Sequence, residues 1–110
     1  MYNGNMKESN YYIYMIRCED NSLYTGITTD FARRLKEHMS GGPKSAKYTK
    51  NHRPKKLEKI WVASSRSQAS KLEYALKKLS KKQKEELISG NSSLVSLLGE
   101  NYNEYSIYNL

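Results

Sequence analysis

Two short segments near the start of the chain are rich in tyrosine and isoleucine and are separated by residues that favour turns. They are residues 11–17 (YYIYMIR) and 22–27 (SLYTGI), with EDNS at the turn between them. This order of residue types predicts a β-hairpin. Because facing residues on paired strands have Cβ atoms about 5 Å apart, Tyr14 and Tyr24 are expected to lie close together.

The residues after the hairpin have the period of an amphipathic helix. Helix-starting residues stand at Thr29 and Asp30, and glycines 41 and 42 end the pattern, which predicts a helix of about three turns. Its inward stripe consists of Phe31, Leu35, His38 and Met39. Arg34 shares the face of His38. The side chains expected to point toward water are Arg33, Lys36 and Glu37.

The rest of the chain supplies a basic segment, one more strand and two more helices. Residues 43–56 contain two prolines and seven basic side chains, the histidine included, without an apolar period, and are predicted to form a basic loop. Residues 57–65 predict a third strand and residues 67–79 a helix. The sequence SKKQ at 80–83 matches a capping box that opens a further helix through residue 89. The predicted order is β-β-α-β-α-α, an α+β fold with helices packed around a three-stranded sheet.

The two ends of the chain differ from its middle. Residues 1–10 are polar and are predicted to be a flexible segment without the pattern of a signal or transit peptide. Residues 11–90 are predicted to form the folded domain, and residues 91–110 a tail that is partly helical or mobile. No apolar run approaches the length of about 20 residues that a membrane span needs. With Cys18 as the single cysteine, we expect a cytoplasmic protein that does not enter a membrane.

Positive charge is concentrated in the middle of the chain. The 110 residues carry 19 lysines and arginines against 11 acidic residues, a net charge of +8. Residues 44–86 alone hold 14 of these basic residues and only four glutamates. Such a surface attracts polyanions through counterion release, and nucleic acid is the commonest polyanion. The alternative is a solvated lysine-rich surface that binds no nucleic acid specifically.

Three polar side chains fall on apolar helix faces. Glu73 lies on or beside the stripe of its helix, where a carboxylate is costly unless it is paired or bound to a metal. An ion pair with Lys77, four residues later, is the structural alternative. Arg34 either covers apolar surface with its stem or presents its guanidinium to a phosphate. His38 by itself is more typical of a satisfied, half-buried side chain than of a ligand or base.

Taken together, these residues form a recognisable set. Residues 11–89 resemble the GIY-YIG nuclease domain family, in particular its small stand-alone branch, through YYIYMIRCEDNSLYTGITTDFARRLKEHMSG and SRSQASKLEYALKKLSKKQK. The positions that match the family in order and approximate spacing are Tyr14, Tyr24, Arg34, His38 and Glu73. Two positions depart from the family's tripeptides, because Tyr12 replaces a glycine and Thr25 an isoleucine. Neither departure removes a catalytic side chain.

The resemblance implies a three-stranded antiparallel sheet flanked by helices and an enzyme that hydrolyses phosphodiester bonds in DNA. It implies one divalent metal ion, Mg²⁺ or Mn²⁺, held by Glu73, and a role for Arg34 in neutralising charge on the phosphate. It also implies that one of Tyr14 and Tyr24 acts as general base and that the other orients the attacking water. His38 is implied as a partner of the phosphate or of the tyrosine pair.

The basic segment and the end of the second long helix are expected to follow the DNA backbone. The predicted nucleic-acid-binding residues are Lys44, Lys47, Tyr48, Lys50, His52, Arg53, Lys77 and Lys78. Of these, Tyr48 or His52 is expected to stack on a splayed base. Since no separate sequence-reading module is visible, cleavage is expected to be structure-selective or weakly sequence-specific, in DNA repair, recombination or turnover, or to depend on recruitment by another protein.

Two other classes of function remain open from the sequence. One is a non-catalytic module of the same fold that binds nucleic acid. The other is a protein-interaction domain that uses the tail, with an apolar patch made of Leu94, Val95, Leu97 and Leu98. The sequence leaves the oligomeric state open.

Overall fold

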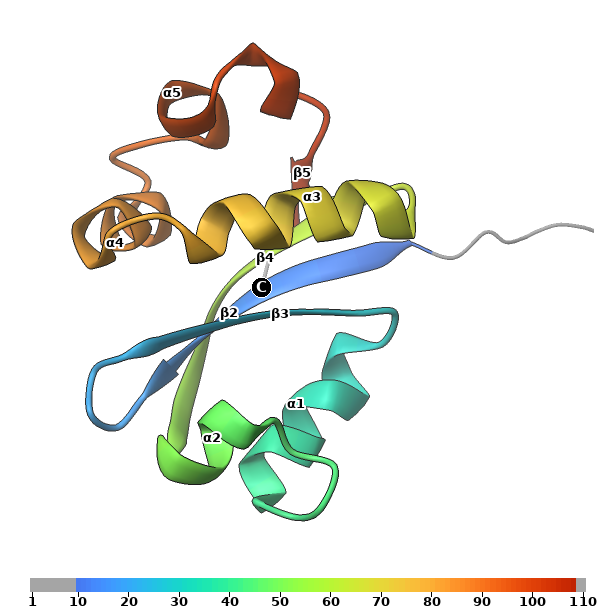
Figure 1. Ribbon diagram of the computed structural model, residues 1–110, viewed down its shortest axis with the longest axis vertical. Helices are drawn as coiled ribbons and strands as arrows, with labels where there is room; N and C mark the ends of the chain where they lie inside the picture. Colours follow the sequence, from blue (N-terminus) through green and yellow to red (C-terminus); the bar gives the residue numbers. More distant parts are fainter. Residues whose placement is uncertain (1–9, 109–110) are drawn as a thin grey trace, which may run out of the picture.

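The computed structural model describes residues 10–108 (Figure 1). The predicted flexible segment, residues 1–10, lies outside the described residues apart from Asn10. The strands are β2 (Tyr11–Cys18), β3 (Leu23–Thr28), β4 (Pro54–Ala63) and β5 (Ser106–Ile107). The helices are α1 (Phe31–Ser40), α2 (Lys47–Asn51), α3 (Arg66–Lys77), α4 (Lys81–Ser89), α5 (Leu94–Leu98) and the short 3-10 helix η1 (Glu100–Tyr102).

The strands form one antiparallel sheet in the order β3-β2-β4-β5, with helices on both faces. In Figure 1, α1 and α2 lie on one side of the sheet, and α3, α4 and α5 lie on the other. The predicted α+β class is therefore confirmed. The prediction of three strands is wrong, because the tail adds β5 as a fourth strand next to β4. β5 has only two residues and forms by pairing with Trp61 and Val62, so it has no period of its own.

The predicted hairpin is present, and its register decides how Tyr14 and Tyr24 meet. Tyr14 stands directly opposite Gly26, and Tyr24 stands opposite Ile16. The two tyrosines are therefore diagonal neighbours on the same face of the sheet, with ring centroids 6.2 Å apart. This face points toward α1, because Tyr14 and Ile16 pack with Phe31 and Leu35 of that helix.

Capping residues set the ends of the helices, as the sequence predicts. Asp30 Oδ1 accepts a hydrogen bond from the Arg33 N–H at 3.1 Å, which starts α1, and Gly41 ends the helix in the left-handed region at φ 68°. The capping box at the start of α4 is complete: Ser80 Oγ accepts from Gln83 N–H, and Gln83 Oε1 accepts from Ser80 N–H.

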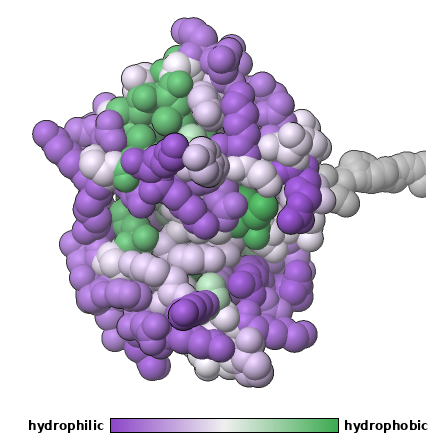
Figure 2. All heavy atoms as spheres, viewed as in Figure 1, coloured by the Kyte–Doolittle hydropathy of each residue, from purple (hydrophilic) through white to green (hydrophobic). Residues whose placement is uncertain are grey.

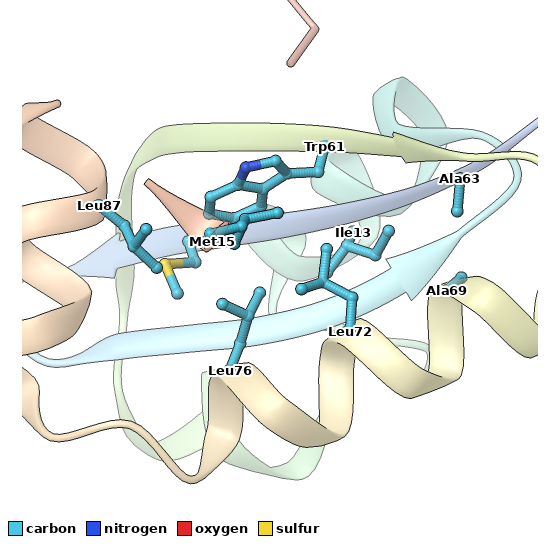
Figure 3. Packing of buried hydrophobic residues seen from close by; sticks show 9 residues of the cluster. Ile13, Met15, Trp61, Ala63, Ala69, Leu72, Leu76 and Leu87 are labelled. Atoms are coloured by element: carbon cyan, nitrogen blue, oxygen red, sulfur yellow. The ribbon is translucent and has the colours of Figure 1, made fainter. Parts of the chain in front are cut away.

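A hydrophobic core fills the space between the sheet and α3 (Figure 3). Leu72 and Leu76 point from α3 toward Ile13 and Met15 of β2, and Leu87 of α4 closes one end beside Met15. A second, smaller core lies on the other face beneath α1. One predicted member of the inward stripe is misplaced: Met39 is 51% exposed, because its neighbour His38 takes the inward position in the last turn of α1 and is completely buried.

The segment predicted as a basic loop, residues 43–56, is partly ordered into regular structure. It contains α2, and its last residues begin β4 at Pro54, which pairs with Cys18. The sequence of α2, KYTKN, has no apolar period, and contacts of its side chains with the rest of the protein hold it in place. Thr49 is buried at 2% exposure, and the ring of Tyr48 stacks on that of Tyr24.

The tail packs on the same molecule. Leu94 joins the main core, with Leu97 and Leu98 packed against it, so most of the apolar patch proposed as an interaction surface is used internally. Tyr108 N–H donates to Ile60 O at 2.9 Å, and the Tyr108 ring meets Phe31 of α1 edge-on. The division of the chain at residue 90 stays a prediction.

The face of the molecule seen in Figure 2 is mostly polar. Hydrophilic residues cover much of the face seen in Figure 2, with an apolar group near its upper end, where Figure 1 places α5. Within residues 10–108, none of the helices has the length and apolar composition needed to cross a membrane.

Candidate active site

Tyr14 lies at the centre of a cluster of polar side chains on the α1 side of the sheet, which also contains Tyr24, His38 and Thr49. Its side chain is almost completely buried, with 3% of its surface exposed, and its ring lies across Gly26 on the neighbouring strand. A Cβ atom at Gly26 would lie 2.5 Å from Tyr14 Oη and 3.1 Å from Tyr24 Cε2. The glycine therefore provides the space in which both tyrosine rings lie.

A chain of hydrogen bonds leads from Tyr14 into the interior. Tyr14 Oη and His38 Nε2 are 2.8 Å apart, and His38 Nδ1 lies 2.9 Å from Thr49 Oγ1. His38 is completely buried although it is ionisable. The three side chains come from β2, α1 and α2, so three separate elements meet at this point.

Burial controls the ionisation of both rings. Burial, and then the neighbouring Tyr24, raises the pKa of the Tyr14 hydroxyl well above its usual range, while the positive charge of Arg34 opposes this rise. Burial, followed by the charge of Arg34, lowers the pKa of His38 to about 4. His38 is therefore neutral near pH 7, with one ring nitrogen able to donate a hydrogen bond and the other able to accept one.

Tyr24 ends a row of aromatic rings that leads away from Tyr14. Tyr48 stacks on Tyr24 with ring centroids 5.6 Å apart. His52 in turn stacks on Tyr48, with ring centroids 4.1 Å apart. His52 Nδ1 lies 2.6 Å from Asp20 Oδ2 in the hairpin turn. Tyr48 thus has neighbours at both sides of its ring. A role for Tyr48 or His52 in stacking on a DNA base stays a prediction.

Arg34 is held in place by two hydrogen bonds from its Nη1 atom. One goes to Glu37 Oε1 at 2.9 Å, and the other goes to the backbone carbonyl of Lys44. Glu37 was expected to point toward water, yet its side chain is only 14% exposed. Its carboxylate also forms an ion pair with Arg33. The two arginines lower the pKa of Glu37, with Arg34 the larger cause. A planar guanidinium anchored at one end can present its other nitrogens to a phosphate.

Glu73 belongs to α3, the helix that packs against the edge strand β3 on the side of the sheet opposite to α1. Its carboxylate pairs with Lys77 Nζ at 3.2 Å, so the ion pair that the sequence offered as an alternative exists. The negative charge of Glu73 is the smallest of the influences that raise the pKa of Tyr14.

The residues present fit a loosely held hard cation. The part of the chain that the structure describes has no group of three or more His, Cys, Asp and Glu side chains suited to a metal. Glu73 would therefore supply a single carboxylate, with its side chain 23% exposed and open to solvent. Mg²⁺ accepts such a site, since it keeps several water ligands and takes others from substrate phosphate.

The predicted nucleic-acid-binding residues fall into two groups on different layers. The first, on and around α2, consists of Lys44, Lys47, Tyr48, Lys50, His52 and Arg53, and its lysines and arginine are exposed. The second, Lys77 and Lys78 at the end of α3, lies on the far side of the sheet. The two groups flank β3, the edge strand to which Tyr24 belongs.

Sequence reasoning missed two residues of this cluster. Gly26 has a sequence signal, because a glycine inside a strand often marks the close approach of another group. Thr49 has none, since a threonine within a lysine-rich segment is ordinary, and only the three-dimensional structure brings it to His38.

The low pKa of His38 makes stability depend on pH. The pKa of His38 is 6.5 in the unfolded chain and about 4 in the folded protein. Between these pH values the unfolded state therefore binds more protons than the folded state. The free energy of unfolding consequently falls as the pH drops from 6.5 to 4. We expect His38 alone to cost about 3 kcal/mol of unfolding free energy between pH 7 and pH 4. Urea unfolding of wild type and His38→Gln at both pH values measures this difference. His52→Gln is the control, and a wild-type loss equal to that of His38→Gln would contradict the prediction.

Comparison with known proteins identifies the class. The model of the GIY-YIG catalytic domain matches residues 10–86, and the chain therefore belongs to the GIY-YIG family, which is endonuclease-type.

The chain is similar to UPF0213 proteins. It is 48% identical over 85 residues to one from Fusobacterium nucleatum, covering 77% of this chain and 83% of that protein. It is 48% identical over 94 residues to one from Yersinia enterocolitica, covering 84% and 95%. A solution NMR structure of a UPF0213 protein from Bacillus halodurans is 43% identical and covers 84% of this chain and 89% of that chain, with a TM-score of 0.47.

Proposed function

We propose that this protein is a DNA endonuclease that hydrolyses phosphodiester bonds with the help of one divalent metal ion. The observation that carries this proposal is the buried Tyr14 hydroxyl, which is bonded to His38 and lies beside Tyr24. The charges of Arg34 and Glu73 both act on its pKa. A core tyrosine with a purely structural role has no need of a buried histidine bonded to its hydroxyl and a guanidinium charge acting on it.

Arg34 would stabilise negative charge on the phosphate. The charge on the nonbridging oxygens grows as water attacks, and a fixed guanidinium aimed at them stabilises the transition state more than the ground state. Glu37 and the Lys44 carbonyl hold Nη1 beforehand, so the side chain loses little freedom when substrate binds.

The tyrosine pair would handle the attacking water. A neutral phenol is a poor base near pH 7, and burial makes Tyr14 a poorer one in the free protein. Arg34 acts in the opposite direction, and further positive charge brought by a metal ion adds to that effect. One of Tyr14 and Tyr24 would accept the proton of the water and the other would orient the water by hydrogen bonding.

Glu73 would hold the ion, either Mg²⁺ or Mn²⁺, and would release Lys77 to do so. The ion would supply positive charge that stabilises the leaving 3′ oxygen. Lys77 and Lys78 are then available to the DNA backbone, together with the exposed basic residues around α2. Backbone contacts of this kind carry no base code, which supports structure-selective or weakly sequence-specific cleavage, as in DNA repair, recombination or turnover.

Cleavage of labelled DNA tests the proposal. The substrates are duplex, single strand, nicked, flap and four-way junction DNA, each with Mg²⁺, Mn²⁺ or a chelator. We expect cleavage with either metal and none with the chelator. Glu73→Gln keeps the size of the side chain but removes its charge, so the metal concentration for half-maximal cleavage should rise at least about ten-fold. Glu100→Gln, an exposed glutamate of η1, is the matched control.

Two outcomes would overturn the proposal. If folded wild-type protein binds these substrates and cuts none of them with either metal, the chain is a nucleic-acid-binding module of the same fold. If Glu73→Gln and Glu100→Gln need the same metal concentration as wild type, Glu73 has only its ion pair with Lys77.

A further inference from the structure

We propose that α2 is a positioning element for the active site: Thr49 and the backbone N–H of Ala46 hold His38 in the tautomer that carries its hydrogen on Nε2. In that form His38 donates a hydrogen bond to Tyr14 Oη. The tautomer itself follows from the geometry alone, and its consequence for cleavage rests on the proposed function.

The groups around Nδ1 of His38 decide the tautomer. Thr49 Oγ1 lies 2.9 Å from this nitrogen, and the N–H of Ala46 is directed at it with an N to N distance of 3.4 Å. The Ala46 group can only donate. A hydrogen on Nδ1 would therefore face another hydrogen, so Nδ1 is the acceptor and the ring hydrogen belongs on Nε2.

The competing arrangement leaves the backbone N–H of Ala46 without its acceptor. Thr49 Oγ1 is also 3.0 Å from Ala46 O, and a hydroxyl that donated there would require Nδ1 to carry the ring hydrogen. The Ala46 N–H would then lose its acceptor in a partly buried position, which costs free energy. The Ala46 carbonyl does not need Thr49, because it already accepts from Lys50 N–H at 3.1 Å.

The consequence for Tyr14 concerns the direction of its hydrogen bond. When His38 Nε2 donates, Tyr14 Oη accepts and its own hydrogen is directed away from His38. A donor already in place at the oxygen stabilises the phenolate that remains after this hydrogen leaves. With the opposite tautomer, Tyr14 would donate to His38 and its hydroxyl hydrogen would be held in the interior.

The same short helix also contacts the second tyrosine. Tyr48, the residue before Thr49, stacks on Tyr24. Two consecutive residues of α2 thus contact His38 and Tyr24, while Lys47 and Lys50 of the same helix are exposed. The contacts explain why α2 is ordered in a segment whose sequence has no helical period.

NMR of the histidine ring nitrogens tests the tautomer directly. In 15N-labelled wild type near pH 7, long-range 1H–15N correlations of His38 are expected to show a protonated Nε2 and an unprotonated Nδ1. Thr49→Val removes the hydroxyl at nearly the same volume, and we expect it to give a mixture of both tautomers. Thr49→Ser keeps the hydroxyl and should keep the wild-type pattern.

Cleavage measurements then test the positioning role. For Thr49→Val we expect kcat to fall about ten-fold at unchanged KM, with recovery in Thr49→Ser. A wild-type spectrum with the hydrogen on Nδ1 would overturn the inference, even if Thr49→Val fails to fold. An unchanged tautomer in folded Thr49→Val would remove the role of Thr49. If wild type shows the expected tautomer but cuts no DNA, the proposed function fails and the tautomer assignment stands.

Discussion

Arg34→Ala is expected to lower the cleavage rate roughly 100- to 1,000-fold, the usual effect of removing one group that stabilises transition-state charge. The reason is the position of the guanidinium, which Glu37 and the Lys44 carbonyl hold close to Tyr14. The loss should appear mainly in kcat, because the interaction strengthens as charge develops on the phosphate. Single-turnover cleavage of the preferred substrate, with circular dichroism to verify folding, measures the effect.

The neighbouring residue provides a matched control for this prediction. Arg33 also pairs with Glu37, at 3.0 Å, but its side chain is 57% exposed on the outer face of α1. Arg33→Ala removes the same charge from the same helix and should change kcat less than about three-fold, since exposed charges act weakly at a distance in salt. Equal losses in the two variants would mean that Arg34 contributes only general positive charge.

Gly26→Ala is expected to disable the site through a single methyl group. The new Cβ would lie 2.5 Å from Tyr14 Oη and 2.7 Å from Tyr14 Cζ, distances that require the ring to move. The backbone itself poses no obstacle, because Gly26 is not among the glycines with positive φ. Overpacking of a buried site costs about 1 to 3 kcal/mol, and we expect a value near the upper end here. The displaced hydroxyl should reduce cleavage at least about 100-fold.

Gly42→Ala distinguishes this effect from a general intolerance of alanine. A Cβ at Gly42 would meet only the flexible Ser40 hydroxyl, at 3.3 Å, and the residue lies outside the tyrosine cluster. Urea unfolding and cleavage assays of both variants should therefore show a large loss for Gly26→Ala and wild-type behaviour for Gly42→Ala. A Gly26→Ala protein with normal stability and normal cleavage would show that Tyr14 need not lie across β3.

The elements that the sequence predicts well are those with local signals. The hairpin has strand-forming residues on both sides of a turn, and α1 and α4 have capping residues at their starts, which agree with the structure. α2 and β5 have no such signals. The first is held by Thr49 and Tyr48, and the second pairs with two residues of β4, so both depend on neighbours distant in sequence. Secondary structure that exists only through tertiary contacts cannot be predicted from a local pattern.

In the candidate site, too, some features follow from local sequence signals and others do not. The diagonal proximity of Tyr14 and Tyr24 follows from the hairpin, and the burial of His38 follows from the stripe of α1. The connection of Glu73 with the tyrosines has no local sequence signal, and only the resemblance to a family suggested it. The direction of the Glu37 side chain was predicted wrongly, because helix periodicity gives a face but does not reveal a neighbouring arginine that draws a carboxylate inward.

The short strand β5 leaves most of the outer edge of β4 without a strand partner. It pairs only with Trp61 and Val62, whereas β4 begins seven residues earlier, at Pro54. An open edge can pair with the edge of another molecule and start aggregation, and proline and lysine are the residues that proteins use to prevent this. Pro54, Lys55 and Lys56 lie along the unpaired part. We therefore expect some of the positive charge that suggests a polyanion partner also to oppose edge-to-edge pairing between copies of the chain.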